Sequence, residues 1–413
     1  MGNQAERGLT EAGGRIASMD QFRGYCVAGM WLVNFLSAFT AIHSILKHNN
    51  TYFSYADSIM PAFLFAAGFS FRLTLLRRTT RDGRSAAYRH AIVRSLALIL
   101  LSLTLSGVSP IAPSWDQLTW MAVREFLARL LKADLWNVLA IIGAVQLVVL
   151  PVAAASAGTR LLTIAVFLAG HAALSCAFNY EFVYGRPNWL DAYWGAAGTR
   201  AWDGGFFGLL MWSVPLLGGT LAYDILTGTK SRGHHVRRLV GVGAALMACG
   251  YGLSCLAMLY EAVPGQQPAP VPHPSPVLPP FERLGSRPLT ALLADPPFVA
   301  PPPPYVRPLS YWTMDKRLVT PSFILFATGF AFALYGGFVL ACDLGGRRSD
   351  TFRMLGQNPL VAYLLHYPVE RSIHALMPDD CPWWWCLLGL ALFLAIMMLF
   401  VRYLDRRKLY LRL

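Results

Sequence analysis

The sequence predicts an all-α polytopic integral membrane protein, a bundle of about ten transmembrane helices with both termini in the cytoplasm. Of its 413 residues, 55% are hydrophobic and 14% are charged, against about 25% charged residues in an ordinary soluble domain. The apolar residues gather in segments of about 20, the length that a helix needs to cross a bilayer. The net charge of +13 fits basic cytoplasmic loops better than nucleic-acid binding.

Ten segments along the chain are long and apolar enough to be predicted as spans. The ninth is the weakest, because it is short and carries ionisable residues near its end. Residues 118–132 differ from the spans, since apolar and charged side chains lie on opposite faces, which is typical of a helix at the membrane interface. The predicted spans are 25–45, 58–76, 92–108, 135–153, 161–180, 206–226, 239–260, 321–342, 359–372 and 383–401.

The distribution of Lys and Arg predicts the orientation. With the N-terminus inside, cytoplasmic segments hold 23 of the 35 basic residues, which indicates that both termini are cytoplasmic. The polar N-terminus lacks the apolar core of a signal peptide, so the first span is expected to direct insertion into the cell membrane, inner or plasma.

This topology divides the chain into four predicted parts. They are a cytoplasmic segment (1–24), a first helix bundle (25–260), an extracytoplasmic loop (261–319), and a second group of spans with a basic tail (320–413). The loop is rich in proline, so we expect an extended linker or lid. The seven cysteines include no C-x-x-C pair, so the sequence predicts neither a metal site nor a redox site.

Polar residues near the first two spans form two groups that could carry chemistry. Asp20 and Arg23 are three residues apart, so they can pair on a helix, or simply cap its cytoplasmic end. Asn34 lies in the first span, and His48 and Asp57 flank the loop that follows. A histidine oriented by a carboxylate is a general base, whereas the alternative is a histidine in water and an aspartate that caps a helix.

Two further groups lie in the second half of the chain. Lys316 and Arg317 precede the eighth span, where cations suit an anionic or sugar ligand, or anchor the chain at the interface. Asn358 opens the ninth span and His366 lies inside it, as either a site or a helix start and a structural histidine. Asp203, before two glycines, indicates a turn first and a site second.

In this order, these groups resemble the transmembrane acetyltransferase family typified by heparan-alpha-glucosaminide N-acetyltransferase and its bacterial relatives. Two departures are Thr51-Tyr52-Phe53, where the family has Trp-x-Gly, and Asp203-Gly204-Gly205, where it has Asp-Pro-Glu-Gly. The resemblance covers most of the chain outside the proline-rich loop. It is carried by residues 15–24, 32–34, 47–48, 56–68, 202–205, 215–219, 315–323 and 358–366.

The resemblance implies about eleven spans, acetyl-CoA as the cytosolic co-substrate, and an amino sugar or other glycan acceptor on the extracytoplasmic side. It matches the family's active-site histidine to His48 and a nearby asparagine to Asn34. His48 is then a general base or an acetyl carrier, Asn34 stabilises the oxyanion, and Asp57 orients His48 or binds a sugar hydroxyl. No metal is expected, and a homodimer is an expectation that these residues do not test.

Binding roles complete the prediction. Basic residues at the cytoplasmic side are expected to meet the phosphates of acetyl-CoA. Two alternatives remain: a transporter or flippase for a small solute or glycolipid, and a non-catalytic membrane protein that retains the fold. The predicted donor-binding residues are Asp20, Arg23 and Arg72, and the predicted acceptor-binding residues are Lys316, Arg317, Asp203, Asn358 and His366.

Overall fold

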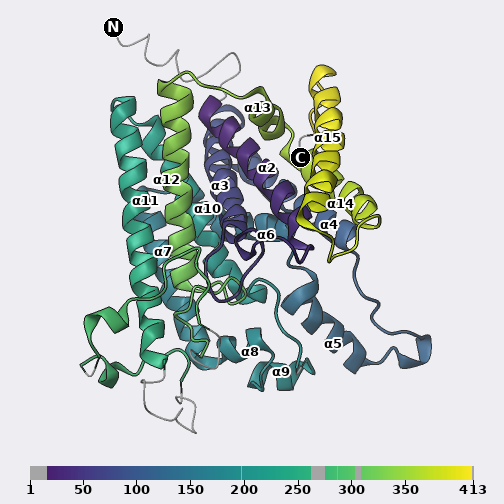
Figure 1. The fold of residues 1–413 in the computed structure, drawn as a ribbon, viewed down its shortest axis with the longest axis vertical. Coiled ribbons are helices and arrows are strands. Elements are labelled where there is room, and N and C mark those ends of the chain that lie inside the picture. Colours follow the sequence, from purple (N-terminus) through teal and green to yellow (C-terminus); the bar gives the residue numbers. More distant parts are fainter. Residues whose placement is uncertain (1–15, 197, 262–274, 286, 303–307, 412–413) are drawn as a thin grey trace.

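The computed structural model describes residues 16–411 apart from 197, 262–274, 286 and 303–307, and within these ranges the chain forms helices and turns but no strand (Figure 1). The all-α prediction is therefore confirmed. The α-helices are α2 (Ala17–Ser37), α3 (Tyr55–Asp82), α4 (Arg84–Ser106), α5 (Trp120–Arg129), α6 (Val138–Ala153), α7 (Ala157–Leu174), α8 (Tyr180–Tyr184), α9 (Trp189–Trp194), α10 (Gly205–Thr227), α11 (Arg232–Ser254), α12 (Pro321–Phe338), α13 (Asp350–Gln357), α14 (Pro359–His374) and α15 (Trp383–Arg406).

Seven helical segments of the described chain are long and apolar enough to cross a membrane. An eighth is counted if a pair bent by 94°, Trp120–Asp134 with Val138–Ala153, is one broken span. The predicted amphipathic segment is thus a separate helix, α5, that turns sharply into α6. The seven segments are Tyr55–Asp82, Arg84–Ser106, Ala157–Tyr184, Gly205–Thr227, Arg232–Tyr260, Pro321–Leu344 and Trp383–Arg406.

The first predicted span is displaced along the chain. Its helix, α2, runs over Ala17–Ser37 rather than 25–45. The early start places Asp20 in the first turn, where a carboxylate is favoured by the helix dipole. The helix ends at Ser37, and three residues later the Thr40 amide donates to the Asp379 carbonyl at 2.8 Å. Figure 1 shows that α2 begins and α15 ends at the same end of the bundle.

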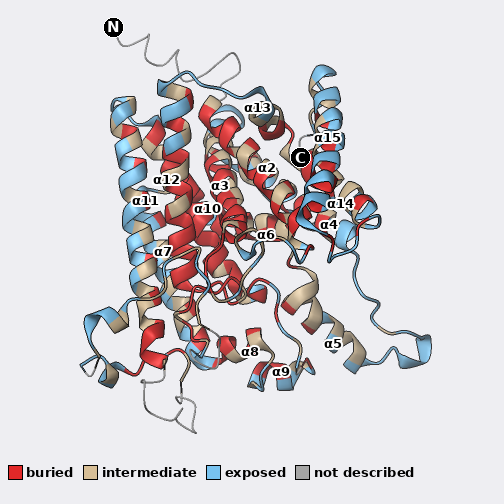
Figure 2. Ribbon diagram, viewed as in Figure 1, coloured by how far each residue is buried: buried red, intermediate tan, exposed pale blue. Residues whose placement is uncertain are grey.

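Three helices form the centre of the bundle, α3, α10 and α12, and Figure 2 shows them largely buried. The contact between α3 and α10 is close because glycines lie at the crossing. A Cβ at Gly68 would lie 1.9 Å from the Leu216 carbonyl oxygen, and one at Gly219 would lie 1.9 Å from that of Phe65. Any larger side chain at either position would push the two helices apart.

The outer helices α4, α7, α11 and α15 carry a different surface. In the most apolar 18-residue stretch of each outer helix, 17% to 33% is buried. In the three central helices the corresponding share is 67% to 78%. Their outward side chains are nevertheless apolar, which is the pattern of a helix that faces lipid rather than water. Exposed examples are Leu96, Leu100, Leu162, Val166, Leu388 and Leu392.

The described part of the proline-rich loop packs on the bundle. It contains two short 3₁₀ helices, Phe281–Arg283 and Leu289–Leu292. The Phe298 amide donates to the Phe53 carbonyl at 2.7 Å, and the two rings pack edge to face. The Tyr251 hydroxyl donates to the Ala294 carbonyl at 2.7 Å. The loop therefore contacts the segment that connects α2 to α3.

Candidate active site

A cavity of about 310 Å³ opens at the end of the bundle where α2 ends and α3 begins. Its walls come from segments far apart in the sequence, namely α2, the α2–α3 loop, α3, the start of α6, the turn before α10, the turn before α12, and α14. The lining residues are Met30, Val33, Asn34, Ser37, His48, Ala56, Ile59, Met60, Phe63, Asn137, Val138, Trp202, Asp203, Lys316, Tyr363, Tyr367 and Glu370.

His48 and Asp57 form an oriented pair at this cavity. The His48 Nδ1 lies 2.9 Å from the Asp57 Oδ1. Asp57 is fully buried, and its Oδ2 accepts hydrogen bonds from the Ser54 hydroxyl at 2.7 Å and the Asn49 amide at 3.1 Å. With Asp57 ionised, Nδ1 carries the proton and Nε2 is the basic nitrogen. The His48 side chain is 44% exposed, so Nε2 is open to a substrate.

Asn34 is held by a second histidine. Its Nδ2 lies 3.1 Å from the His366 Nε2, while the His366 Nδ1 donates to the Tyr363 carbonyl. That bond makes Nε2 the acceptor of the ring, so Asn34 donates one amide hydrogen to it and keeps a second. His366 is fully buried and lies behind the cavity wall. It connects α14 to α2 and fixes the rotamer of Asn34.

The cavity also holds an ion pair between Lys316 Nζ and Asp203 Oδ1, 3.6 Å apart. Asp203 has a left-handed backbone (φ 44°). The neighbouring Asp315 accepts hydrogen bonds from the Tyr184 hydroxyl and, at 2.6 Å, from the Arg317 amide. Complete burial raises the pKa of Asp315 to about 6. These contacts fix the turn from which Lys316 reaches the cavity.

The remaining predicted residues lie away from the cavity. Arg23 pairs with Asp20 on α2. Asn358 is buried and donates to the Leu409 carbonyl at 3.0 Å. Arg317 is partly buried, and its contact with Asp315 is made through the backbone amide. Arg72 lies further along α3, ten residues before the helix ends at Asp82.

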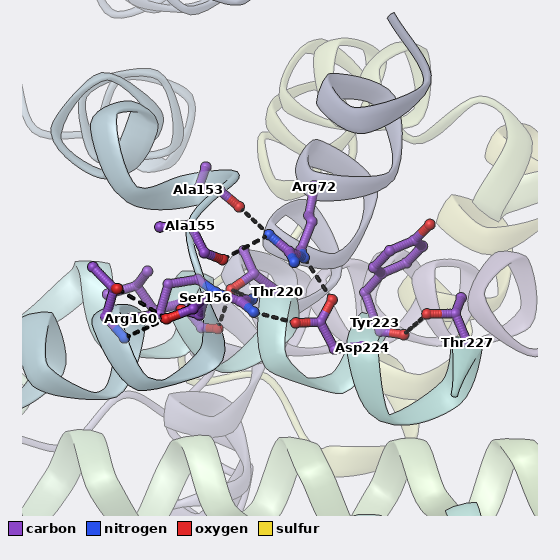
Figure 3. Close-up of polar contacts among 11 residues, drawn as sticks. Arg72, Ala153, Ala155, Ser156, Arg160, Thr220, Tyr223, Asp224 and Thr227 are labelled. Atoms are coloured by element: carbon purple, nitrogen blue, oxygen red, sulfur yellow. Dashed lines mark hydrogen bonds and ion pairs between the residues drawn. The ribbon is translucent and has the colours of Figure 1, made fainter. Parts of the chain in front are cut away.

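Arg72 belongs to a buried ion-pair network between α3, α7 and α10 (Figure 3). Its Nε donates to the Asp224 Oδ1 at 2.6 Å, and its Nη1 donates to the Ala153 carbonyl at 2.5 Å. Arg160 donates to the other oxygen of Asp224 and, at 2.8 Å, to the Thr220 hydroxyl. The guanidinium group of Arg72 is therefore already bonded to other groups of the protein.

Three cavity residues on α14 were not assigned a role from the sequence: Tyr363, Tyr367 and Glu370. Their spacing of four and then three residues places them on one face of a helix. This spacing is the feature of the sequence that could have identified them. The Glu370 Oε2 is buried and has no hydrogen-bond partner within the described residues. A carboxylate left in this state at a cavity wall is suited to bind a substrate group.

The described part of the chain holds no group of three or more His, Cys, Asp or Glu side chains that could bind a metal ion. The described cavity residues include a base, an amide donor and carboxylates. A thioester or another activated acyl group is a substrate that such a site can use.

The fold and the cavity define a class: a multi-pass membrane protein with an oriented His–Asp pair in a polar cavity. Within this class, residues 15–260 match the family described as heparan-alpha-glucosaminide N-acetyltransferase, catalytic, and the chain belongs to that family. The matched region covers more than half of the chain, from the start of α2 to the end of α11 and its 3₁₀ extension, and it includes Asn34, His48 and Asp57. A search for similar curated proteins found no match. The family implies an acetyltransferase activity.

Proposed function

We propose that this protein transfers an acetyl group from cytosolic acetyl-CoA to a glycan acceptor on the other side of the membrane, with His48 as the central residue. The observation that carries the proposal is the His48–Asp57 pair, which opens to a cavity together with Asn34. The family membership supports the transferase reaction. Both the acceptor and the direction of transfer belong to the proposal.

In the proposed reaction, the Nε2 of His48 removes a proton from an amine or hydroxyl of the acceptor. The acceptor atom attacks the thioester carbonyl, the carbon–sulfur bond breaks, and coenzyme A leaves as a thiolate that takes up a proton. If His48 instead carries the acetyl group, Nε2 attacks the thioester first and the acceptor attacks the acetyl-imidazole. Asp57 holds the imidazole in the required tautomer in either case.

Asn34 and Glu370 would complete the site. The amide hydrogen of Asn34 that is not used by His366 would stabilise the oxyanion, an interaction of about 3–4 kcal/mol where such donors have been removed. Glu370 would accept hydrogen bonds from a hydroxyl or amino group of the acceptor, and the Asp203–Lys316 pair would contact its other polar groups. These groups suit a sugar, which presents several hydroxyls.

For the donor, we propose Arg23 and the neighbouring Arg78 and Arg94 at the opposite end of α2. Arg94 lies within electrostatic range of the other two, and the Nε atoms of Arg23 and Arg94 are buried without a partner in the described part of the chain. Phosphates favour such clusters of guanidinium groups. Arg72, which is held by Asp224, is assigned a structural role.

The test is acetyl-CoA turnover by the purified protein in detergent, followed as release of free thiol with and without a panel of amino sugars. His48→Ala should reduce turnover by about 10²–10⁴-fold, the contribution of a general base. The matched control is His43→Ala, because His43 lies in the same loop but is exposed and does not line the cavity.

Two results would contradict the proposal. Equal loss in the two histidine variants would mean that the loop, rather than His48, is required. An absence of both thiol release and coenzyme A binding in the wild-type protein would exclude the transferase and direct the search to transport of a solute.

A further inference from the structure

Two cysteines lie next to each other where the turn after α14 enters α15. The Sγ atoms of Cys381 and Cys386 are 3.4 Å apart, and both side chains are buried. The Cys386 thiol also points to the Cys381 carbonyl oxygen at 3.7 Å. Their C-x₄-C spacing is not a redox motif, so the contact arises from the fold: Cys386 lies in the first turn of α15, and the turn before it brings Cys381 alongside.

The two sulfur atoms are close enough for a disulfide to form with a small movement. A bond requires the sulfurs to approach to about 2.05 Å, which is a movement of little more than 1 Å for two side chains that already face each other. The segment between them contains Pro382, which has a fixed φ and precedes the first turn of α15. The backbone that would hold the cross-link is therefore already restricted.

The position of the turn relates it to the candidate active site. Lys47, next to His48, lies within electrostatic range of Cys386. The Asp379 carbonyl accepts the Thr40 amide at 2.8 Å, and the His374 Nε2 lies 3.0 Å from the Phe35 carbonyl oxygen. The turn therefore packs against the end of α2, at the end of the bundle that our proposed function assigns to the extracytoplasmic side.

Three tryptophans lie between the two cysteines, Trp383, Trp384 and Trp385, and all are exposed. Tryptophan is enriched where a helix leaves the hydrocarbon for the headgroup region. The exposed tryptophans indicate that the cysteine pair is near the boundary of the bilayer, where an extracytoplasmic oxidant could reach the turn before it packs.

We propose that Cys381 and Cys386 form a disulfide in the mature protein. This inference rests on the proposed orientation, because disulfides persist in extracytoplasmic compartments and are reduced in the cytosol. The step is thiol–disulfide exchange with a disulfide-bonded oxidant. The two thiols lose two electrons and two protons and form one S–S bond, while the disulfide of the oxidant becomes a dithiol.

The cross-link would fix one wall of the cavity. The turn that it closes follows α14 directly, and α14 carries Glu370 on the cavity and His366 behind it. The Asp379 carbonyl in this turn accepts the amide of Thr40, three residues after the end of α2, the helix that carries Asn34. A fixed turn therefore keeps the Asn34–His366 contact in place, because it holds the ends of both helices together.

The experiment counts thiols in the full chain. Protein purified in detergent without reductant is denatured and alkylated with a maleimide reagent that adds a resolvable mass to each thiol. Of the seven cysteines, five should react before reduction and seven after it. Peptide mass analysis should place the link between Cys381 and Cys386, with a mass 2 Da below that of the dithiol. Seven reactive thiols before reduction would overturn the proposal.

A stability measurement separates the cross-link from the loss of the side chains. Treatment with dithiothreitol should lower the Tm of the wild-type protein but leave that of the Cys381→Ser, Cys386→Ser double variant unchanged. The control is Cys176→Ser, Cys249→Ser, which removes two exposed cysteines and should keep the wild-type response. A wild-type Tm that does not respond to the reductant would contradict a role for the link in holding the turn.

These outcomes are independent of the transferase assay. Thiol counting reports the disulfide whether or not acetyl-CoA is turned over. A protein with the disulfide but without thiol release would retain this inference and lose the proposed function, and the opposite result would do the reverse.

Discussion

Two polar clusters lie toward opposite ends of the same two helices, α3 and α10, and they differ in how fully their hydrogen-bonding groups are satisfied. Asp57 in the first turn of α3 and Asp203 before α10 belong to the cavity. Arg72 and Asp224, further along these helices, belong to the buried ion-pair network (Figure 3). Both clusters contain charges in a mainly apolar bundle, where each requires a compensating partner.

In the ion-pair network, protein groups occupy the charged atoms. Asp224 accepts an arginine on each carboxylate oxygen, and the two guanidinium groups also donate to a carbonyl and a hydroxyl. In the cavity, the Glu370 Oε2 has no partner in the described part of the chain, and His48 is bonded there through only one nitrogen. The first arrangement stabilises a fold, and the second leaves atoms for a substrate.

The largest expected effect is at Asp57, on the cavity side of this comparison. Asp57→Asn keeps the size of the side chain but lets the amide donate to the His48 Nδ1, which makes Nε2 the protonated nitrogen. We expect kcat to fall by about 10³–10⁴-fold, because the base has the wrong tautomer. The measurement is thiol release at saturating acetyl-CoA, with the Tm recorded in parallel. A variant that loses activity only in proportion to folded protein would contradict a catalytic role.

The ion-pair network should give the opposite pattern. Asp224→Ala leaves Arg72 and the fully buried Arg160 without their carboxylate, and breaking such a pair costs about 3 kcal/mol. We expect a lower Tm and a smaller yield of monodisperse protein, while the folded fraction keeps its kcat. The control is Asp82→Ala, since Asp82 pairs with an exposed Arg81 and should leave the Tm nearly unchanged. Equal effects from both variants would refute the structural role.

The sequence was sufficient to predict the helical membrane class, because that class depends on local signals. For His48 and Asp57 the residues alone left both a site and a helix cap open, and the family resemblance selected them together with Asn34; their catalytic role stays a prediction. Long apolar segments predict helices, and the polar residues lie near the ends of two consecutive spans. Arg72 was predicted to bind the donor because it lies in a basic segment of the sequence. Its partner Asp224 lies 152 residues further along the chain. Pairing across that separation depends on tertiary structure.

Glu370 was not assigned a role for the same physical reason. It is one of the ionisable residues near the end of the weak ninth span, but its cavity is built from segments that begin at Met30 and end at Glu370 itself. The end of α2 at Ser37 was also missed, and the chain that follows it contacts a distant segment, since Thr40 bonds to Asp379, 339 residues further along. Local sequence patterns do not report such contacts.

A substitution at Glu370 has the smallest expected effect. It is also the most direct test of whether the cavity group without a hydrogen-bond partner in the described part of the chain binds substrate. Glu370→Gln keeps the shape but removes the charge, and a hydrogen bond to a charged group is worth about 1.5–3 kcal/mol. We expect the KM for the acceptor to rise by about 10–100-fold, with little change in the KM for acetyl-CoA or in the Tm. The matched control is Glu181→Gln, since Glu181 pairs with Arg186 away from the cavity. A raised KM for both substrates, or a lower Tm, would contradict acceptor binding. It would mean that Glu370 has a structural role, like the ion pairs shown in Figure 3.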